Sequence, residues 1–188
     1  MASADPTLDT VDERRLVDAC LAGTAGAFDL IVERHRRSIY QLCYRFVGNH
    51  EDASDLSQDV FLRAYRGLRN FRGQSSLATW LYRIGVNVCL NRVSAKAVAS
   101  EPIAERQFVD VDAESASDRL LRTERGAKVR SAIAQLPPKQ RATLILRMYH
   151  EMSHQEIADT LGGSIGAVKA NFFHALGNLR KLLGHEDL

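Results

Sequence analysis

The stretch at residues 152–183, MSHQEIADTLGGSIGAVKANFFHALGNLRKLL, constrains the fold more than any other part of the chain. Ser153 and Glu156 form an S-x-x-E capping box, which predicts that a helix begins at this serine. The pair Gly162-Gly163 can adopt the positive φ that ends a helix and turns the chain. Ser164 then suits the N-cap of a second helix of about 20 residues. The pattern therefore predicts a helix-turn-helix.

The second of these helices has two faces of different character. One face repeats apolar residues at helical spacing, and we expect it to pack in the core. It consists of Val168, Phe172, Ala175, Leu176, Leu179 and Leu183. The opposite face has three cations and no carboxylate, and consists of Lys169, Ala170, Phe173, His174, Gly177, Arg180 and Lys181, with Asn171 at its edge. Such a face is typical of a helix that reads the major groove of DNA. The solvated face of an ordinary helical hairpin is the alternative.

Two strings in this region match catalytic motifs. Residues 150–154, HEMSH, match the H-E-x-x-H zinc-protease motif, which requires both histidines on one face of one helix. Because Ser153 is expected to cap a new helix between them, we do not expect a metal site. Residues 162–166, GGSIG, match the G-x-S-x-G nucleophile elbow, which must follow a β-strand. The preceding segment has helical spacing, so we predict no catalytic residue and no cofactor.

The composition sets the size and the class of the protein. The chain has 188 residues, of which 45% are hydrophobic, enough for one ordinary domain or two small ones. Cys20, Cys43 and Cys89 are widely spaced in apolar runs, so we expect small core residues in a reducing compartment. There is no apolar signal region and no run of about 18 apolar residues. We therefore expect a soluble cytoplasmic protein.

The N-terminal half indicates several helices in succession. We expect residues 1–10 to be a disordered tail, residues 12–21 a short helix, and residues 27–46 a longer helix that ends at Gly48-Asn49. The next segment, EDASDLSQDVFLRAYRGLRNF, also has helical spacing.

An acidic ridge is expected on that next helix. On a helical wheel, Asp52, Asp55 and Asp59 fall within about 60° of one another, beside an apolar row. Like charges at this spacing repel by roughly 0.2–0.5 kcal/mol per pair, and a cationic partner would relieve that cost. The alternative is an acidic first turn that complements the helix dipole, which accounts poorly for Asp59.

Residues 60–100 contain no carboxylate. They carry interleaved arginines and aromatic residues, namely Arg63, Arg66, Arg69, Arg72, Arg83 and Arg92 with Phe61, Tyr65, Phe71, Trp80 and Tyr82. This composition suits strand-separated nucleic acid, because cations contact phosphates and rings stack on bases for about 1–3 kcal/mol each. We expect the loop at 70–75 to form a pocket, and Phe61 and Trp80 to be at least partly buried.

The helix after this loop should begin at Ser75 or Ser76. Its expected buried residues are Leu77, Leu81, Ile84 and Val88, and its expected flank is Arg83, Asn87 and Asn91. Farther on, residues 100–118 hold six acids against one base, which indicates a flexible anionic segment. A helix resumes at Asp118, and Pro137-Pro138 suits the start of the following one. The expected buried face of that helix is Leu144, Ile145, Met148 and Tyr149.

Two motifs together resemble a known family. DASDLSQDVFLRAY followed by FRGQSSLATWLYRIGVNVCLN is similar to the second conserved region of the extracytoplasmic-function, sigma-E-like sigma factors of bacterial RNA polymerase. Residues 136–183, beginning LPPKQRATLILRMYHEMSHQEIADTL, resemble their fourth region. The resemblance covers about three-quarters of the chain and implies an all-α fold of two small helical domains. These domains would be residues 11–94 and 128–185, joined by a flexible acidic linker at 95–127.

The resemblance also implies three binding surfaces and no catalysis. Core RNA polymerase would be bound by Asp52, Asp55, Leu56, Gln58, Asp59 and Phe61. The melted minus-ten promoter element would be bound by Asn70, Phe71, Arg72, Gln74, Ser75, Trp80, Arg83 and Asn87. The duplex minus-35 element would be bound by Ser164, Lys169, Ala170, Asn171, Phe173 and His174. An anti-sigma factor is the further implied partner. The linker would either thread the polymerase or act as a simple tether.

The reading helix departs from the pattern of the family. Where relatives commonly carry V-K-S-R-x-x-R-A-R, this chain has VKANFFHAL, which keeps Lys169 but offers Asn171 and His174. Asparagine prefers adenine edges, and Phe173 can contact a thymine methyl group, so we expect a distinct minus-35 preference. A stand-alone helix-turn-helix regulator that works without polymerase is the alternative function.

Overall fold

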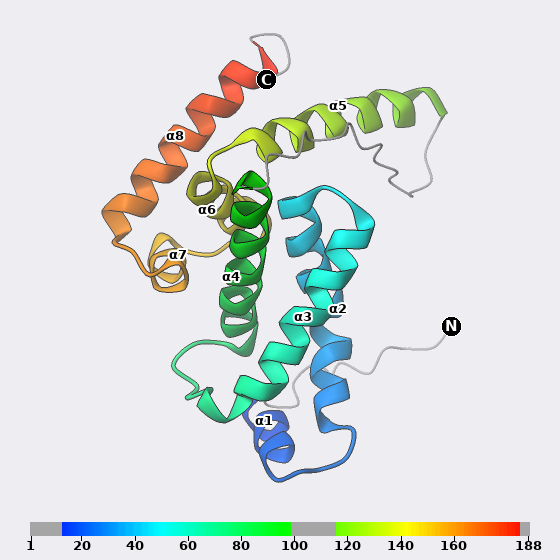
Figure 1. Cartoon of the computed structure of the whole chain (residues 1–188), viewed down its shortest axis with the longest axis vertical. Coiled ribbons are helices and arrows are strands. Elements are labelled where there is room, and N and C mark those ends of the chain that lie inside the picture. The colour runs from blue at the N-terminus through cyan, green and yellow to red at the C-terminus, as the bar shows by residue number, and fades with distance from the viewer. Residues whose placement is uncertain (1–12, 99–115, 185–188) are drawn as a thin grey trace.

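The computed structural model describes the backbone of residues 13–98 and 116–184, and the side chains of residues 13–95 and 125–184. The described elements are α1 (Glu13–Leu21), α2 (Ala27–Val47), α3 (His50–Gly67), the 3₁₀ helix η1 (Leu68–Asn70), α4 (Leu77–Val98), α5 (Ala116–Gln135), α6 (Pro138–Tyr149), α7 (His154–Leu161) and α8 (Ile165–Leu183) (Figure 1). These ranges contain helices and no strand, so the all-α prediction is confirmed. The predicted N-terminal tail and most of the acidic segment lie outside the described residues.

The expected helix boundaries follow from local chemistry. The Gly48 N–H donates to the Tyr44 carbonyl at 2.8 Å and, with φ 73°, ends α2. The side chains of Ser153 and Glu156 form the predicted capping box at α7. The Ser164 hydroxyl accepts from the Ala167 N–H at 3.1 Å to begin α8. The predicted helix-turn-helix is therefore confirmed.

Helices α1 to α4 form a first lobe around one apolar core. Leu42 of α2, Val60 of α3 and Leu81 of α4 are completely buried there. Gly85 allows α4 to approach α2 closely, because a Cβ at this position would lie only 2.7 Å from Leu42 Cδ2. The close packing of these three helices fixes the relative positions of their outer faces.

Helices α5 to α8 form a second lobe, in which two predictions about buried faces need correction. In α6, Leu144 and Ile145 are buried as expected, but Met148 is 58% exposed and Tyr149 42% exposed. In this last turn of α6 the buried side chain is Leu146 instead. In α8, Val168 and Ala175 are buried, whereas Leu176 is exposed. The exposed Leu176 lies toward the edge of the apolar stripe, away from its centre.

The two lobes pack against each other. Arg141 Nη1 of α6 donates to the Phe46 carbonyl at the end of α2, at 3.0 Å. The Arg45 guanidinium lies 4.0 Å from the centre of the Tyr149 ring. The rings of Tyr82 and His150 lie 4.4 Å apart. Burial, together with the Arg45 charge, lowers the pKa of His150 from 6.5 to about 4. The lobes therefore share a partly buried seam.

Part of the predicted linker is helical. Helix α4 continues to Val98 and α5 begins at Ala116, while residues 99–115 lie outside the described part of the chain. Cys43 and Cys89 are buried free thiols, as expected, and a hydrogen bond between them and burial raise the pKa of Cys89. Within the described ranges, no helix has the length and apolar character needed to cross a bilayer.

Candidate nucleic-acid interface

A hollow of about 330 Å³ lies between the end of α3 and the first half of α4. It brings together three of the predicted minus-ten residues, Asn70, Trp80 and Asn87. Sequence analysis did not assign the other lining residues, which are Arg63, Gly67 and Ile84. The carboxylate-free arginine run did include Arg63. The hollow therefore combines two amides, a cation and an aromatic face.

Trp80, which lines this hollow, packs against Phe71, which lines a second hollow beside α1. The Phe71 and Trp80 rings lie 5.4 Å apart and are tilted by 55°. Both side chains are partly buried, as expected for Trp80. Gly67 leaves room beside the indole, since a Cβ there would lie 3.6 Å from Trp80 Cζ2. The indole of Trp80 is thus held between a loop residue and a glycine of α3.

The remaining predicted minus-ten residues do not line the hollow. Gln74, Ser75 and Arg83 are exposed and are not among its lining residues. Arg72 instead lines a second hollow of about 230 Å³ between the loop and α1. The structure therefore divides the predicted set into pocket residues and surrounding surface residues.

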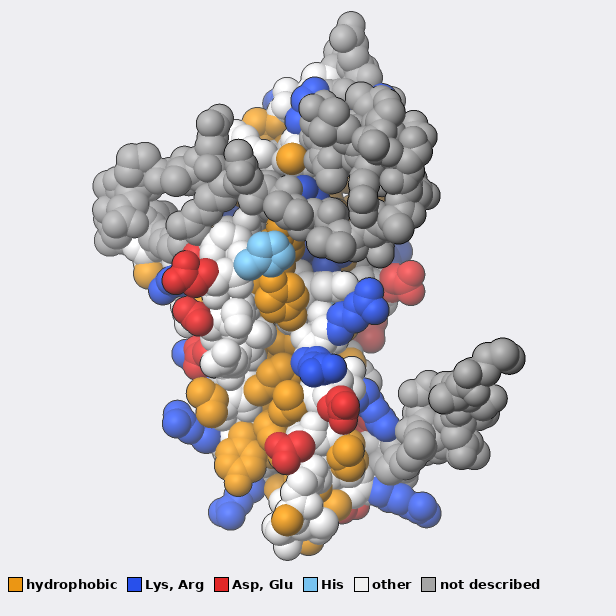
Figure 2. All heavy atoms as spheres, turned by 90° about the vertical axis from the view of Figure 1, so that its right-hand side faces the viewer, with side chains coloured by type: hydrophobic (Ala, Val, Ile, Leu, Met, Phe, Trp, Pro, Cys, Tyr) orange, Lys and Arg blue, Asp and Glu red, His pale blue; other side chains and the backbone are white. Residues whose placement is uncertain are grey.

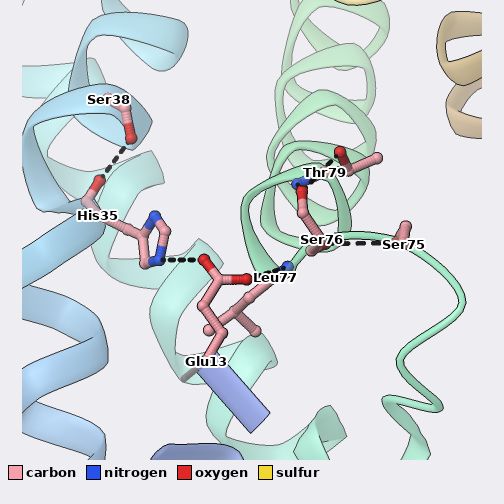
Figure 3. A network of polar contacts seen from close by, with 7 residues as sticks. All are labelled: Glu13, His35, Ser38, Ser75, Ser76, Leu77 and Thr79. Carbon is pink, nitrogen blue, oxygen red and sulfur yellow. Dashed lines mark hydrogen bonds and ion pairs between the residues drawn. The ribbon is translucent and has the colours of Figure 1, made fainter. Parts of the chain in front are cut away.

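Helix α4 begins after Ser76, which the sequence analysis named as one of two candidates. The Ser76 hydroxyl accepts from the Thr79 N–H at 3.1 Å, while Ser75 donates to the Ser76 carbonyl (Figure 3). The Leu77 N–H donates to Glu13 Oε2 of α1 at 3.0 Å. The sequence contains no signal for this last contact, which joins residues 64 positions apart.

The predicted acidic ridge of α3 is not continuous. Asp52 is buried, and its carboxylate accepts from Arg92 Nη2 and from Asn49 Nδ2, each at 2.6 Å. Asp59 forms an i,i+4 ion pair with Arg63 at 3.0 Å. The expected ridge of Asp52, Asp55 and Asp59 is therefore interrupted at Asp52, because α4 supplies a cation to the first turn of α3.

The exposed face of α3 is more apolar than the sequence analysis predicted. Asp55 and Gln58 are exposed, whereas Leu56 is buried and Phe61 partly buried. The other exposed residues of this face include Leu62 at 55% and Tyr65 at 65% exposure. Hydrophobic side chains are visible among charged ones on this side of the molecule (Figure 2). Leu62 and Tyr65 were missed because helical spacing alone does not show which apolar residues remain uncovered.

The predicted reading face of α8 is open. Ser164 caps the helix, and Lys169, Ala170 and His174 are exposed. Phe173 is 74% exposed, and Asn171, at the edge of the face, is partly buried. About three adjacent turns of one helix thus present cationic, aromatic and amide groups.

The two catalytic strings have no catalytic geometry. His150 follows the end of α6, Glu151 has φ 52°, and His154 begins α7, so the two histidines do not share one helix. Ser164 lies between two helices rather than after a strand. Among the described residues, no group of three or more His, Cys, Asp or Glu side chains is arranged to hold a metal ion.

Two family models match the two lobes. Sigma-70 region 2 matches residues 31–98, and Sigma-70 region 4 matches residues 126–179. The RNA polymerase sigma-H factor of Pseudomonas aeruginosa is 36% identical over 180 residues, covering 91% of this chain and 93% of that protein. The ECF sigma factor SigM of Mycobacterium tuberculosis is 35% identical, covering 92% and 85%. The chain belongs to the extracytoplasmic-function (ECF) sigma factors.

Solved structures show the same architecture as this ECF sigma factor. CnrH, in complex with the cytosolic domain of CnrY, matches with a TM-score of 0.65 and 26% identity, covering 90% of this chain and 96% of that chain. The sigma factor RpoE of Bartonella quintana, in complex with the anti-sigma factor NepR, shares the fold with a TM-score of 0.64 at 20% identity, covering 86% and 99%.

Proposed function

We propose that this ECF sigma factor connects core RNA polymerase to promoter DNA through three surfaces of one chain. The observation that carries the proposal is the hollow between α3 and α4, where Arg63, Asn70, Trp80 and Asn87 converge. No carboxylate is among its lining residues, and Arg63 is held at its edge by the ion pair with Asp59. These groups suit a single unpaired base. A protein that reads only duplex DNA would have no need of a pocket for such a base.

The hollow is proposed to receive a base of the minus-ten element. Extruding a base from a duplex costs a few kcal/mol, of the order of 3, which contacts in a pocket must offset. Stacking on Trp80 supplies about 1–3 kcal/mol. The amides of Asn70 and Asn87 can bond the Watson–Crick edge, and Arg63 can contact a phosphate. The exposed Arg72, Arg83, Gln74 and Ser75, with Phe71, would hold the adjacent strand.

The outer face of α3 is proposed to bind the polymerase. Its accessible residues are Asp55, Gln58, Leu62 and Tyr65, with Asp59 at the edge. Leu56, Phe61 and Asp52 support this face from within rather than by contact. An exposed apolar centre beside carboxylates is typical of a protein–protein interface.

The reading face of α8 is proposed to bind the minus-35 element as duplex. Phe173 would lie against a thymine methyl group and Asn171 against an adenine, while Lys169 contacts phosphate. Ser164, Ala170 and His174 complete this surface near the start of the helix. The absence of arginine at these positions favours an A·T-rich element.

The protein itself is proposed to catalyse no reaction. The polymerase supplies the chemistry of transcription, and the sigma factor supplies promoter specificity and strand separation in the cytoplasm, where the polymerase works. An anti-sigma factor would hold it inactive, as the anti-sigma factor NepR is bound to RpoE in the matching structure.

Transcription with purified core polymerase tests this function. Core with wild-type protein should select promoters from a pool of randomised templates, and Asn87→Ala should reduce run-off transcript about tenfold from the selected promoter. Asn91→Ala is the matched control, because this exposed residue lies one turn along α4 and does not line the hollow. Binding to the promoter with equal affinity in the absence of core would instead support a stand-alone regulator.

A further inference from the structure

One carboxylate ties α1 to the start of α4. Glu13 Oε2 accepts from the Leu77 N–H at 3.0 Å, and Glu13 Oε1 lies 3.9 Å from His35 Nε2 of α2 (Figure 3). Three helices therefore meet at a single side chain. Helix α1 lies outside the region 2 match, which begins at residue 31. Neither match therefore assigns a role to Glu13.

The bonded N–H belongs to the helix that carries the pocket. Leu77 is the first residue of α4, and Trp80 follows by almost one turn. Across the hollow from α4 lie Gly67 and Asn70, at the end of α3 and in η1. A shift at the start of α4 would therefore move the indole relative to the opposite wall.

Helix α1 also supports the loop that precedes α4. Arg14, Val17, Asp18 and Leu21 form one side of the second hollow, and loop residues 71–73 form the other. Within this loop, Gly73 has φ 67°, a conformation that favours glycine. Phe71 contacts both this hollow and the Trp80 ring. Contacts therefore run without interruption from α1 through the loop to the pocket.

We propose that Glu13 is a positioning residue for the minus-ten pocket, an inference that rests on the proposed function of that pocket. The first N–H groups of a helix have no partner within the helix, so α4 needs an external acceptor. A carboxylate also interacts favourably with the positive end of the helix dipole. Without Glu13 the first turn of α4 loosens, and the bound strand must then order both this turn and the loop.

The test uses the full chain assembled with core polymerase and a single-stranded oligonucleotide that carries the minus-ten sequence selected by the wild-type holoenzyme. We expect Glu13→Ala to weaken binding of this oligonucleotide five- to twentyfold. Glu13→Gln keeps an oxygen acceptor and should remain within about threefold of wild type. Glu33→Ala removes an exposed acid of α2 and is the charge control. Affinity for a duplex minus-35 fragment should be unchanged in all three.

Trp80 reports directly on the pocket, because the chain contains one tryptophan. Acrylamide should quench its fluorescence more strongly in folded Glu13→Ala, and not in Glu33→Ala. If the alanine variant does not fold, Glu13→Asp replaces it, since its shorter side chain keeps the charge but cannot reach the Leu77 N–H at the same distance. Folded variants that match wild type in oligonucleotide affinity and in quenching would overturn the inference alone. Failure of the wild-type holoenzyme to bind the oligonucleotide would overturn the pocket's proposed function as well.

Discussion

The two lobes build their proposed DNA-binding surfaces in different ways. In the first lobe, the start of α4 is held by Glu13, 64 residues before Leu77. The start of α3 is joined to the second half of α4 by Asp52 and Arg92, 40 residues apart. In the second lobe, the polar contacts that begin α7 and α8 span three residues each. Both lobes thus begin their helices with local caps, but among the described residues only in the first lobe is a helix start that borders the proposed surface also held by a distant residue. In the second lobe, the distant side-chain contact of α8 lies farther along the helix, between Asn178 and Gln140 of α6.

This difference determines how each surface responds to change. A pocket formed by several helices loses its shape when any one of them shifts, whereas a face on one helix needs only that helix. We expect substitutions far from the hollow to impair the first lobe. The reading face of the second lobe should be impaired mainly by residues on α8, at its caps, or where α5, α6 and α7 pack against it.

The seam between the lobes gives the largest expected effect. Burial against Tyr82 and Arg45 lowers the pKa of His150 from 6.5 to about 4. The folded state thus binds this proton less readily than the unfolded state. The free energy of unfolding is therefore unaffected by His150 protonation above pH 6.5, and it declines as the pH falls toward 4. At 1.36 kcal/mol per pKa unit, the loss amounts to at most about 3 kcal/mol.

Urea unfolding between pH 7 and pH 4 measures this loss. His150→Phe keeps a ring against Tyr82 but has no proton to bind, so its free energy of unfolding should fall less steeply over this range. The difference between the two curves isolates His150 from the carboxylates and from His35, whose pKa is also lowered by burial. Parallel curves for the two proteins would show that His150 is not buried in the seam.

The second largest effect concerns the ion pair inside the first lobe. Asp52→Ala should lower the free energy of unfolding by about 2 kcal/mol, because it removes an acceptor from both Arg92 and Asn49. The value is moderate because the Arg92 side chain is 46% exposed and can be hydrated. Asp55→Ala on the same helix should change stability by less than about 0.5 kcal/mol. Asp55→Lys, rather than reversal of Asp52, is then the clean test of polymerase binding.

The same difference explains what the sequence could predict. The capping box at Ser153, the turn at Gly162 and the exposure of Phe173 follow from local spacing, and the structure confirms each of them. Asn70, Trp80 and Asn87 were named together by the resemblance to the family, and the structure places all three in the lining of one hollow. Asp52 was misplaced because its partner lies on α4. Periodicity within one helix contains no information about a cation 40 residues away.

The exposure of Met148 in α6 and of Leu62 and Tyr65 in α3 was not predicted, for a related reason. Helical spacing marks an apolar residue as a candidate for burial, but burial also needs a facing element. Met148 and Tyr65 lack sufficient cover and remain 58% and 65% exposed. Lobe packing and the contribution of Glu13 likewise depend on tertiary contacts that no local pattern encodes.

Two helical glycines give a smaller contrast between the lobes. Gly177→Ala on α8 should raise the free energy of unfolding by about 1 kcal/mol, because its Cβ would meet no atom within 4 Å and alanine favours a helix. Gly85→Ala on α4 should instead lower it by about 1 kcal/mol. There the same gain is outweighed by overlap with Leu42, which is fully buried and cannot easily move. Urea unfolding of both variants checks the signs, and a gain in both would mean that the first lobe is less tightly packed.

The smallest effect is expected on the reading face of α8. Phe173→Ala should leave stability nearly unchanged, since the side chain is 74% exposed. It should weaken binding of holoenzyme to the selected minus-35 duplex roughly threefold, because one thymine methyl contact is weaker than a bidentate base contact. The loss should vanish on a duplex in which uracil replaces that thymine. Lys169→Ala should instead weaken binding to all duplexes. It should also reduce the slope of log K against log salt concentration by about one, as expected for the loss of a phosphate contact. An equal loss for Phe173→Ala on both duplexes would mean that this ring orders α8 rather than reads the base.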